Sequence, residues 1–205
     1  MRTTIVTAMA VMALAVPAPA QAASQPGVAS IGSASFTKAG TTVTVPTQGH
    51  CSINGPTQAT AETTSRPGIT FGGGTSSCTA PDATTTKSTA TGKNFDLSAL
   101  VSAGGPKVKL SSFTVTCEAT QTQTSASWTY GGMSGIANPP RPVPVGYVSP
   151  LRKPDGTVLA NAVFNSQSLP GDGSIGLTML RIEFLPPSGM SGTVTLGSTE
   201  CSPTP

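Results

Sequence analysis

The sequence predicts an all-β protein: an antiparallel β-sandwich of immunoglobulin-like or jelly-roll-like type, stapled by disulfides and carrying long loops rich in Thr, Ser, Gly and Pro. Three observations support this class. Only 9% of the 205 residues are charged, while 23 are Gly and 19 are Pro, so helix-favouring runs of Glu, Lys, Leu and Arg are scarce. Val alternates with Thr in several segments, as in half-buried strands. Four cysteines behind an N-terminal export signal favour a small secreted fold.

The N-terminus has the features of a secretory signal peptide over residues 1–22. Arg2 precedes an apolar run over residues 5–16, and small residues lead to the expected cleavage after Ala22. The apolar run is shorter than the roughly 20 residues that span a bilayer. We therefore expect one secreted β domain over residues 23–205. Because the final LGSTECSPTP holds no sorting motif, we expect release, or retention at the cell envelope by non-covalent contacts alone.

The first part of the mature chain predicts two strands and then loops. Residues 27–46 read as two strands around a turn at Lys38-Ala39-Gly40. Val43 and Val45 lie two apart and should share one face. From residue 46 to about residue 90, Thr, Ser, Gly and Pro dominate, so we expect long loops with isolated short strands there.

The middle of the chain is ambiguous at one place and clear after it. Residues 94–106 allow a short helix that Gly104-Gly105-Pro106 would end, or a strand in which apolar residues alternate. Residues 107–132 predict two strands, the first with a bulge at Ser111-Ser112 that keeps its apolar side chains on one face.

The last third predicts two hairpins behind a proline-rich segment. Prolines between residues 139 and 150 exclude a central strand and favour an edge strand or a polyproline II path. A turn at residues 153–157 should join the first hairpin. In the second hairpin, alternation assigns two faces. Thr178, Leu180, Ile182 and Phe184 are expected on the buried face, and Leu177, Met179, Arg181, Glu183 and Leu185 on the opposite face.

The four cysteines predict two disulfides with three connectivities open. We favour Cys51 with Cys78, which would pin the Thr- and Gly-rich segment between them. We favour Cys117 with Cys201, which would tie the strand that contains Cys117 to the last one. On the chain-entropy model these two loops contribute roughly 3.5 and 4.5 kcal/mol of stability.

No motif points to catalysis or to a metal. His50 adjoins Cys51, but structural zinc needs four ligands and the chain has one His and no C-x₂-C, so we interpret His50 as a loop residue. The eight carboxylates are scattered and no G-x-S-x-G is present. We therefore expect no cofactor and no enzymatic activity, and a hydrolase assembled from distant loops is the weaker alternative.

Three aromatic residues are the candidate ligand-binding residues. Trp128 and Tyr130 lie two apart on a predicted strand, so both rings point to the same side. Paired rings can stack on sugars, or they can fill the core, and a chain with only 4% aromatic residues favours the core. Tyr147, in the proline-rich segment, is the third candidate.

The charge distribution excludes two classes of partner. The formal net charge is +3, and the cations are scattered along the chain. Nucleic-acid binding requires Lys and Arg clustered on one face, and attachment of the mature chain to a membrane through charge requires a polybasic patch. We expect neither.

Four segments resemble the "choice-of-anchor P" type of secreted actinobacterial protein. These are FTVTCEAT (113–120), GTVLANAVFNSQ (156–167), SIGLTMLRIEFL (174–185) and GTVTLGSTEC (192–201). The resemblance implies an exported β-rich surface domain with Cys117 and Cys201 as the matching cysteine pair, and it implies no catalytic activity.

These observations together predict a secreted, non-enzymatic extracellular or cell-envelope protein with a structural or adhesive role. The alternative is a glycan-binding or cell-wall-binding module that uses Trp128 and Tyr130. Cell-wall polysaccharide or a surface protein is the expected partner.

Overall fold

The computed structural model describes residues 27–203, and the signal peptide predicted for residues 1–22 lies outside this part. The strands are β1 (Gly27–Lys38), β2 (Thr41–Gln48), β3 (Cys51–Ser52), β4 (Gln58–Ala61), β5 (Thr64–Arg66), β6 (Ile69–Phe71), β7 (Gly74–Asp82), β8 (Thr85–Leu97), β9 (Val108–Ala119), β10 (Thr124–Gly131), β11 (Tyr147–Arg152), β12 (Val158–Ser168), β13 (Ile175–Phe184) and β14 (Met190–Cys201). Two short 3-10 helices are η1 (Ala99–Ala103) and η2 (Pro186–Ser188).

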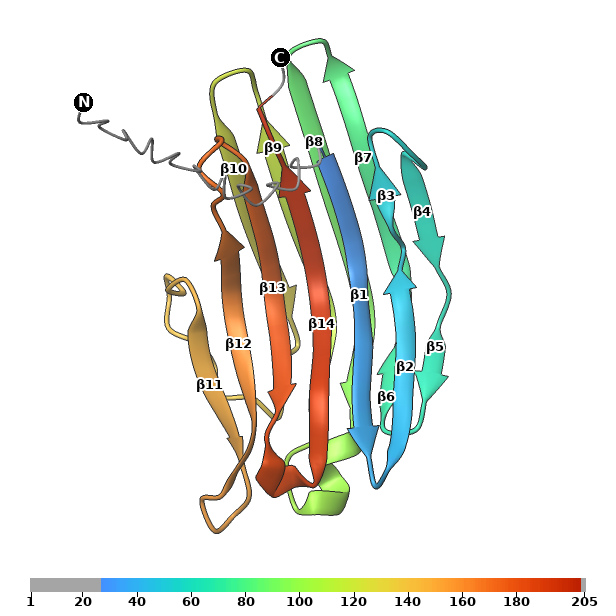
Figure 1. Ribbon diagram of the computed structural model, residues 1–205, viewed down its shortest axis with the longest axis vertical. Helices are drawn as coiled ribbons and strands as arrows, with labels where there is room; N and C mark the ends of the chain where they lie inside the picture. The colour runs from blue at the N-terminus through green and yellow to red at the C-terminus, as the bar shows by residue number, and fades with distance from the viewer. Residues whose placement is uncertain (1–26, 204–205) are drawn as a thin grey trace, which may run out of the picture.

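Two antiparallel sheets pack face to face, which confirms the predicted all-β sandwich (Figure 1). The first sheet has the order β11-β12-β13-β14-β1-β2, with β3 paired to β1. The second has the order β10-β9-β8-β6-β5, with β7 beside β8 and β4 beside β7. Side chains from both inner faces form one main core, in which Phe36 of β1 contacts Phe184 of β13 with ring centroids 5.0 Å apart, and a smaller cluster surrounds Cys117 and Cys201.

Several predicted elements are confirmed. Strands β1 and β2 form the first hairpin, and Val43 and Val45 are buried on its inner face. Residues 94–106 combine both alternatives, because β8 continues to Leu97 and η1 follows before Gly104 ends it in a left-handed conformation. Strand β11 is an edge strand, as its proline content predicted, and it pairs with β12 as expected.

The prediction of long loops between residues 46 and 90 is wrong. Strands β3 to β7 and the first part of β8 occupy most of this segment, and β7 and β8 form a long hairpin. The inward positions of that hairpin carry small side chains, including Ser76, Cys78, Ser88 and Ala90. Backbone hydrogen bonds can hold such a hairpin together without large apolar side chains. Because Ser and Ala occupy its inner face, the sequence shows no alternation of apolar and polar residues there.

Four adjacent strands of the first sheet change their buried face at the same level, and we call this level the face switch. Each strand has consecutive buried residues there, two in β1, β13 and β14 and a run over residues 162–165 in β12. The pairs are Ile31-Gly32 in β1, Phe164-Asn165 in β12, Met179-Leu180 in β13 and Leu196-Gly197 in β14. The pairing registers place these four pairs side by side and stay constant across them. Asn165 (φ 55°) and Gly197 (φ 61°) adopt the left-handed conformation that permits the change.

The face switch corrects the predicted faces of β13. Leu180, Ile182 and Phe184 are buried as expected. Leu177 and Met179 were expected on the opposite face but are also buried, because the strand inverts between Met179 and Leu180. Thr178 accordingly points outward, toward Ser198 of the next strand.

The second sheet has a matching inversion between β8 and β9. Strand β9 changes face at Ser111-Ser112, where a bulge was predicted. The register with β8 is nevertheless unbroken, since Lys93 pairs with Ser112 and Phe95 with Leu110. No residue is inserted because β8 changes face at the same level, where Asn94 has a φ of 49°.

Both favoured disulfides are present, and each joins the two sheets. Cys51 of β3 bonds to Cys78 of β7, with Cα atoms 5.7 Å apart, and Cys117 of β9 bonds to Cys201 of β14, with Cα atoms 5.9 Å apart. Disulfides persist in oxidising compartments, so they indicate an extracellular environment. Within residues 27–203, no helix has the length and apolar character needed to cross a bilayer.

Gly197→Ala tests the face switch. An added Cβ would lie 2.8 Å from Val115 Cγ1 on the facing sheet, in a left-handed conformation that disfavours Ala. Strain and overpacking together should lower the free energy of unfolding by about 3 kcal/mol, measured by urea denaturation. Gly189→Ala is the control, because its φ of 69° is similar and its Cβ would meet nothing within 4 Å. That variant should lose only about 1 kcal/mol, and equal losses would contradict the expected contact.

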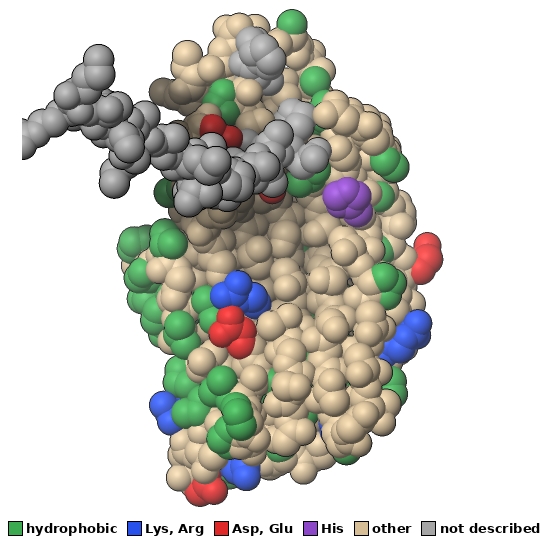
Figure 2. Space-filling model, in the orientation of Figure 1, with side chains coloured by type: hydrophobic (Ala, Val, Ile, Leu, Met, Phe, Trp, Pro, Cys, Tyr) green, Lys and Arg blue, Asp and Glu red, His purple; other side chains and the backbone are tan. Residues whose placement is uncertain are grey.

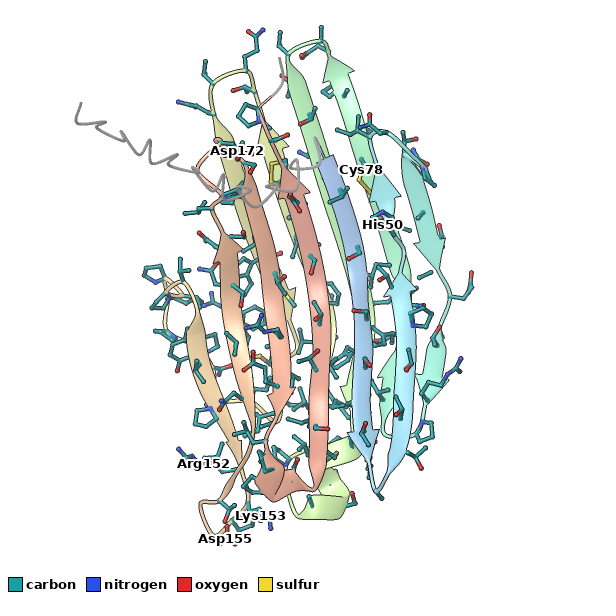
Figure 3. All side chains as sticks on the ribbon, in the orientation of Figure 1. His50, Cys78, Arg152, Lys153, Asp155 and Asp172 are labelled. Atoms are coloured by element: carbon teal, nitrogen blue, oxygen red, sulfur yellow. A yellow bond between two sulfur atoms is a disulfide. The ribbon has the colours of Figure 1, made fainter. Side chains whose placement is uncertain are left out.

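Asp155 in the β11–β12 turn predicts a pH effect (Figure 3). The Thr157 backbone N–H donates to Asp155 Oδ1 at 2.8 Å, and this bond, the Thr157 hydroxyl and nearby Lys153 hold the pKa of the carboxyl below its ordinary value of 3.8. Its contribution to stability is therefore present above pH 3.8 and lost as pH falls through the lower folded value. Asp155→Asn should be less stable than wild type at neutral pH, and the difference should vanish in acid. A carboxyl NMR titration should show the lowered pKa directly.

Candidate functional site

An aromatic cluster fills one open edge of the sandwich. Strand β10 is the edge of the second sheet, and β11 and β12 lie at the same side of the first (Figure 1). Alternation along β10 points Trp128 and Tyr130 toward the space between the sheets, where both are partly buried. Tyr147 begins β11, opposite Phe164 of β12, and is partly buried as well.

The rings contact one another in a chain that crosses between the sheets. The centroids of Trp128 and Tyr130 are 5.8 Å apart with an interplanar angle of 24°. Trp128 lies 6.2 Å from Phe164 at 23°, and Phe164 lies 6.4 Å from Tyr147 at 42°. Such offset contacts are favourable beyond the area they bury. The cluster is thus a rigid extension of the core that reaches the surface.

Asn165 fixes the polar edge of the tryptophan. Because the face switch turns Asn165 inward, its Oδ1 accepts from Trp128 Nε1 at 3.3 Å and from Gln167 Nε2 at 3.0 Å. Its Nδ2 donates to the Val143 carbonyl at 3.0 Å. One buried amide therefore joins both sheets and the segment that links β10 to β11.

A cleft of about 470 Å³ opens beside the two β10 rings, and we call it the aromatic cleft. Trp128, Thr129 and Tyr130 form one wall, and Arg141, Pro142 and Val143 of the β10–β11 segment form the other. The volume lies within the range of about 300–1,000 Å³ that is typical of small-molecule sites. Figure 2 shows apolar side chains gathered along this edge, where Val145 and Val148 are exposed.

The chemistry of the aromatic cleft suits binding. The residues that line it carry two aromatic rings, a proline ring, the Thr129 hydroxyl and the Arg141 guanidinium. No carboxylate, imidazole or thiol is among the described residues that line it. Stacking on the rings and hydrogen bonds from Arg141 can hold a ligand, but this set provides no paired general acid and base.

The predicted aromatic residues separate into two roles. Trp128 and Tyr130 lie together, and each both packs on the core and lines the cleft. Tyr147 joins the cluster through Phe164 and does not line the cleft. Arg141 and Asn165 were missed, because they lie far from Trp128 in the sequence and carry no motif.

His50 lies in the connection between β2 and β3 and is exposed. Cys51 beside it is committed to a disulfide with Cys78 (Figure 3). Among the described residues, no three His, Cys, Asp or Glu side chains are placed to hold a metal ion.

Comparison of the chain with protein-family models, with curated proteins and with solved structures yielded no match.

Asn165→Gly tests the hydrogen bonds that the Asn165 side chain makes to Trp128 and Val143. Glycine tolerates the left-handed backbone, so the variant removes the side-chain bonds without adding strain. Leaving the indole N–H and the Val143 carbonyl without this partner should lower the free energy of unfolding by about 1–3 kcal/mol. It should also increase iodide quenching of fluorescence, which reports only on Trp128 because the chain has one Trp. Asn161→Gly on the same strand is the control and should leave quenching unchanged.

Proposed function

We propose that the protein is a secreted, non-enzymatic protein of the extracellular space or cell envelope, with an adhesive role, and that it holds glycan in the aromatic cleft. The observation that carries this proposal is the cleft itself, a space of about 470 Å³ lined by Trp128, Tyr130 and Arg141. Aromatic rings stack on the apolar faces of sugar rings, and a guanidinium donates to their hydroxyl or acidic groups. The two disulfides support a function in the oxidising environment outside the cell.

A surface-exposed role also agrees with the resemblance to secreted actinobacterial surface domains. The export signal expected over residues 1–22 would deliver the chain to the envelope, and cell-wall polysaccharide would be the nearest abundant ligand. The structural role is the broader version of the same proposal. A sandwich cross-linked by two disulfides could fill a structural role without using the cleft. The experiment below therefore tests the glycan ligand.

Co-sedimentation with native cell wall and with insoluble polysaccharides tests the proposal. We expect the wild-type protein to pellet with at least one of them, and Trp128→Ala to weaken binding about tenfold or more, equivalent to about 1.4 kcal/mol. Arg141 is exposed, so Arg141→Ala should weaken binding without loss of stability.

The matched control for this test is Arg66→Ala. Arg66 is an equally exposed arginine on β5, at the other edge of the second sheet, and its loss should leave binding unchanged. Absence of wild-type binding to every polysaccharide would reject the glycan ligand and turn the search to protein partners. Equal binding by wild type and both cleft variants would place the site elsewhere.

A further inference from the structure

A second hollow lies on the outer face of the first sheet, on the side away from the core. It has a volume of about 430 Å³ and crosses β12, β13, β14 and β1, and we call it the hydroxyl groove. The face switch creates its floor, because beyond that level the even-numbered residues of all four strands point outward. Figure 2 shows this face, with the single histidine at one side.

One row of hydroxyl side chains forms the floor. Ser166 pairs with Thr178, Thr178 with Ser198, and Ser198 with Ser30, so four adjacent strands each contribute one hydroxyl. Neighbouring strands are about 4.8 Å apart, which makes the row about 14 Å long. Each hydroxyl can both donate and accept.

A second row of residues, two positions further along each strand, gives the groove its depth and its negative charge. Ser168, Gly176 and Glu200 lie side by side across β12, β13 and β14. Gly176 has no side chain, so the space between Ser168 and Glu200 stays open. The carboxylate of Glu200 therefore lies beside an unfilled position of the sheet.

Several polar groups of the groove have no partner within the described chain. The Ser166 hydroxyl is buried without a hydrogen bond. The side chains of Glu200 and His50 make no hydrogen bond or ion pair with any described residue. Arg181 also lines the groove, but its guanidinium forms an ion pair with Glu183 at 2.8 Å. Among the described residues that line the groove, Glu200 is the one carboxylate.

We propose that the hydroxyl groove binds an amino sugar that carries a free ammonium group. The hydroxyl row matches the hydroxyls of a sugar, and Glu200 would pair with the ammonium in a charge-assisted hydrogen bond. No Phe, Trp or Tyr is among the described residues that line the groove, so hydrogen bonds and charge replace the stacking of the aromatic cleft. The volume fits a small ligand. The groove is a separate site from the one in the proposed function and does not depend on it.

Isothermal titration calorimetry with β-1,4-linked oligomers of glucosamine, and with the same oligomers fully N-acetylated, tests the groove. Acetylation removes the charge and keeps the ring hydroxyls. The protein secreted by an expressing culture should bind the free amine at least tenfold more tightly than the acetylated form. Glu200→Gln should abolish that preference while leaving the fold intact, because Glu200 is a partly exposed side chain on the outer face.

Three further variants separate the outcomes. Glu62→Gln is the matched control at an exposed carboxylate on another part of the surface, and it should bind like wild type. Ser30→Ala, which removes one hydroxyl of the floor row, should weaken binding of the free amine severalfold. Trp128→Ala should retain groove binding even if it loses polysaccharide binding. Equal affinity for both oligomers, an unchanged preference in Glu200→Gln, or loss of the preference in Trp128→Ala would each overturn the proposal.

Discussion

The inversion of four neighbouring strands at one level is the constraint on which the rest of the first sheet depends. A β-strand alternates its side chains between two faces, so a change of face requires a local departure from extended backbone. Asn165 and Gly197 supply it through left-handed conformations on alternate strands. Since the registers on either side stay the same, the strands must invert together, and one strand that failed to invert would place its apolar side chains outside.

The inversion assigns chemistry to both sides of the sheet. On the inner side it turns the Asn165 amide toward Trp128, where it joins the two sheets and the segment that covers them. On the outer side it lines up the hydroxyls from Ser166 to Ser30 and leaves Glu200 beside a glycine. The aromatic cleft and the hydroxyl groove thus have a common origin in backbone geometry, although they lie on different faces of the sheet.

The disulfides compensate for the part of the sandwich that has the least apolar material. The hairpin of β7 and β8 places Ser76, Ser88 and Ala90 against the first sheet, and the two serine hydroxyls are buried without partners. Such a layer contributes little hydrophobic stabilisation. Cys51–Cys78 joins the two sheets beside this layer, and Cys117–Cys201 joins them at the end of β14, so covalent bonds add to the packing at both places.

By itself the sequence determined the all-β class, the presence of two disulfides, the edge position of the proline-rich strand and the shared side of Trp128 and Tyr130. These follow from composition and local spacing, which act within a few residues. The sequence favoured the observed cysteine pairs, and the structure selected them from three possible connectivities. Only the tertiary structure decided that residues 46–90 form strands, that Met179 is buried, and that Arg141 and Asn165 meet Trp128. Where the inward residues are small, the strand shows no alternation of apolar and polar side chains. Where a residue such as Asn165 has a positive φ, the alternation changes face within the strand. Neither feature leaves a recognisable pattern in the sequence. Cross-strand register, which is a long-range property, brings the site together.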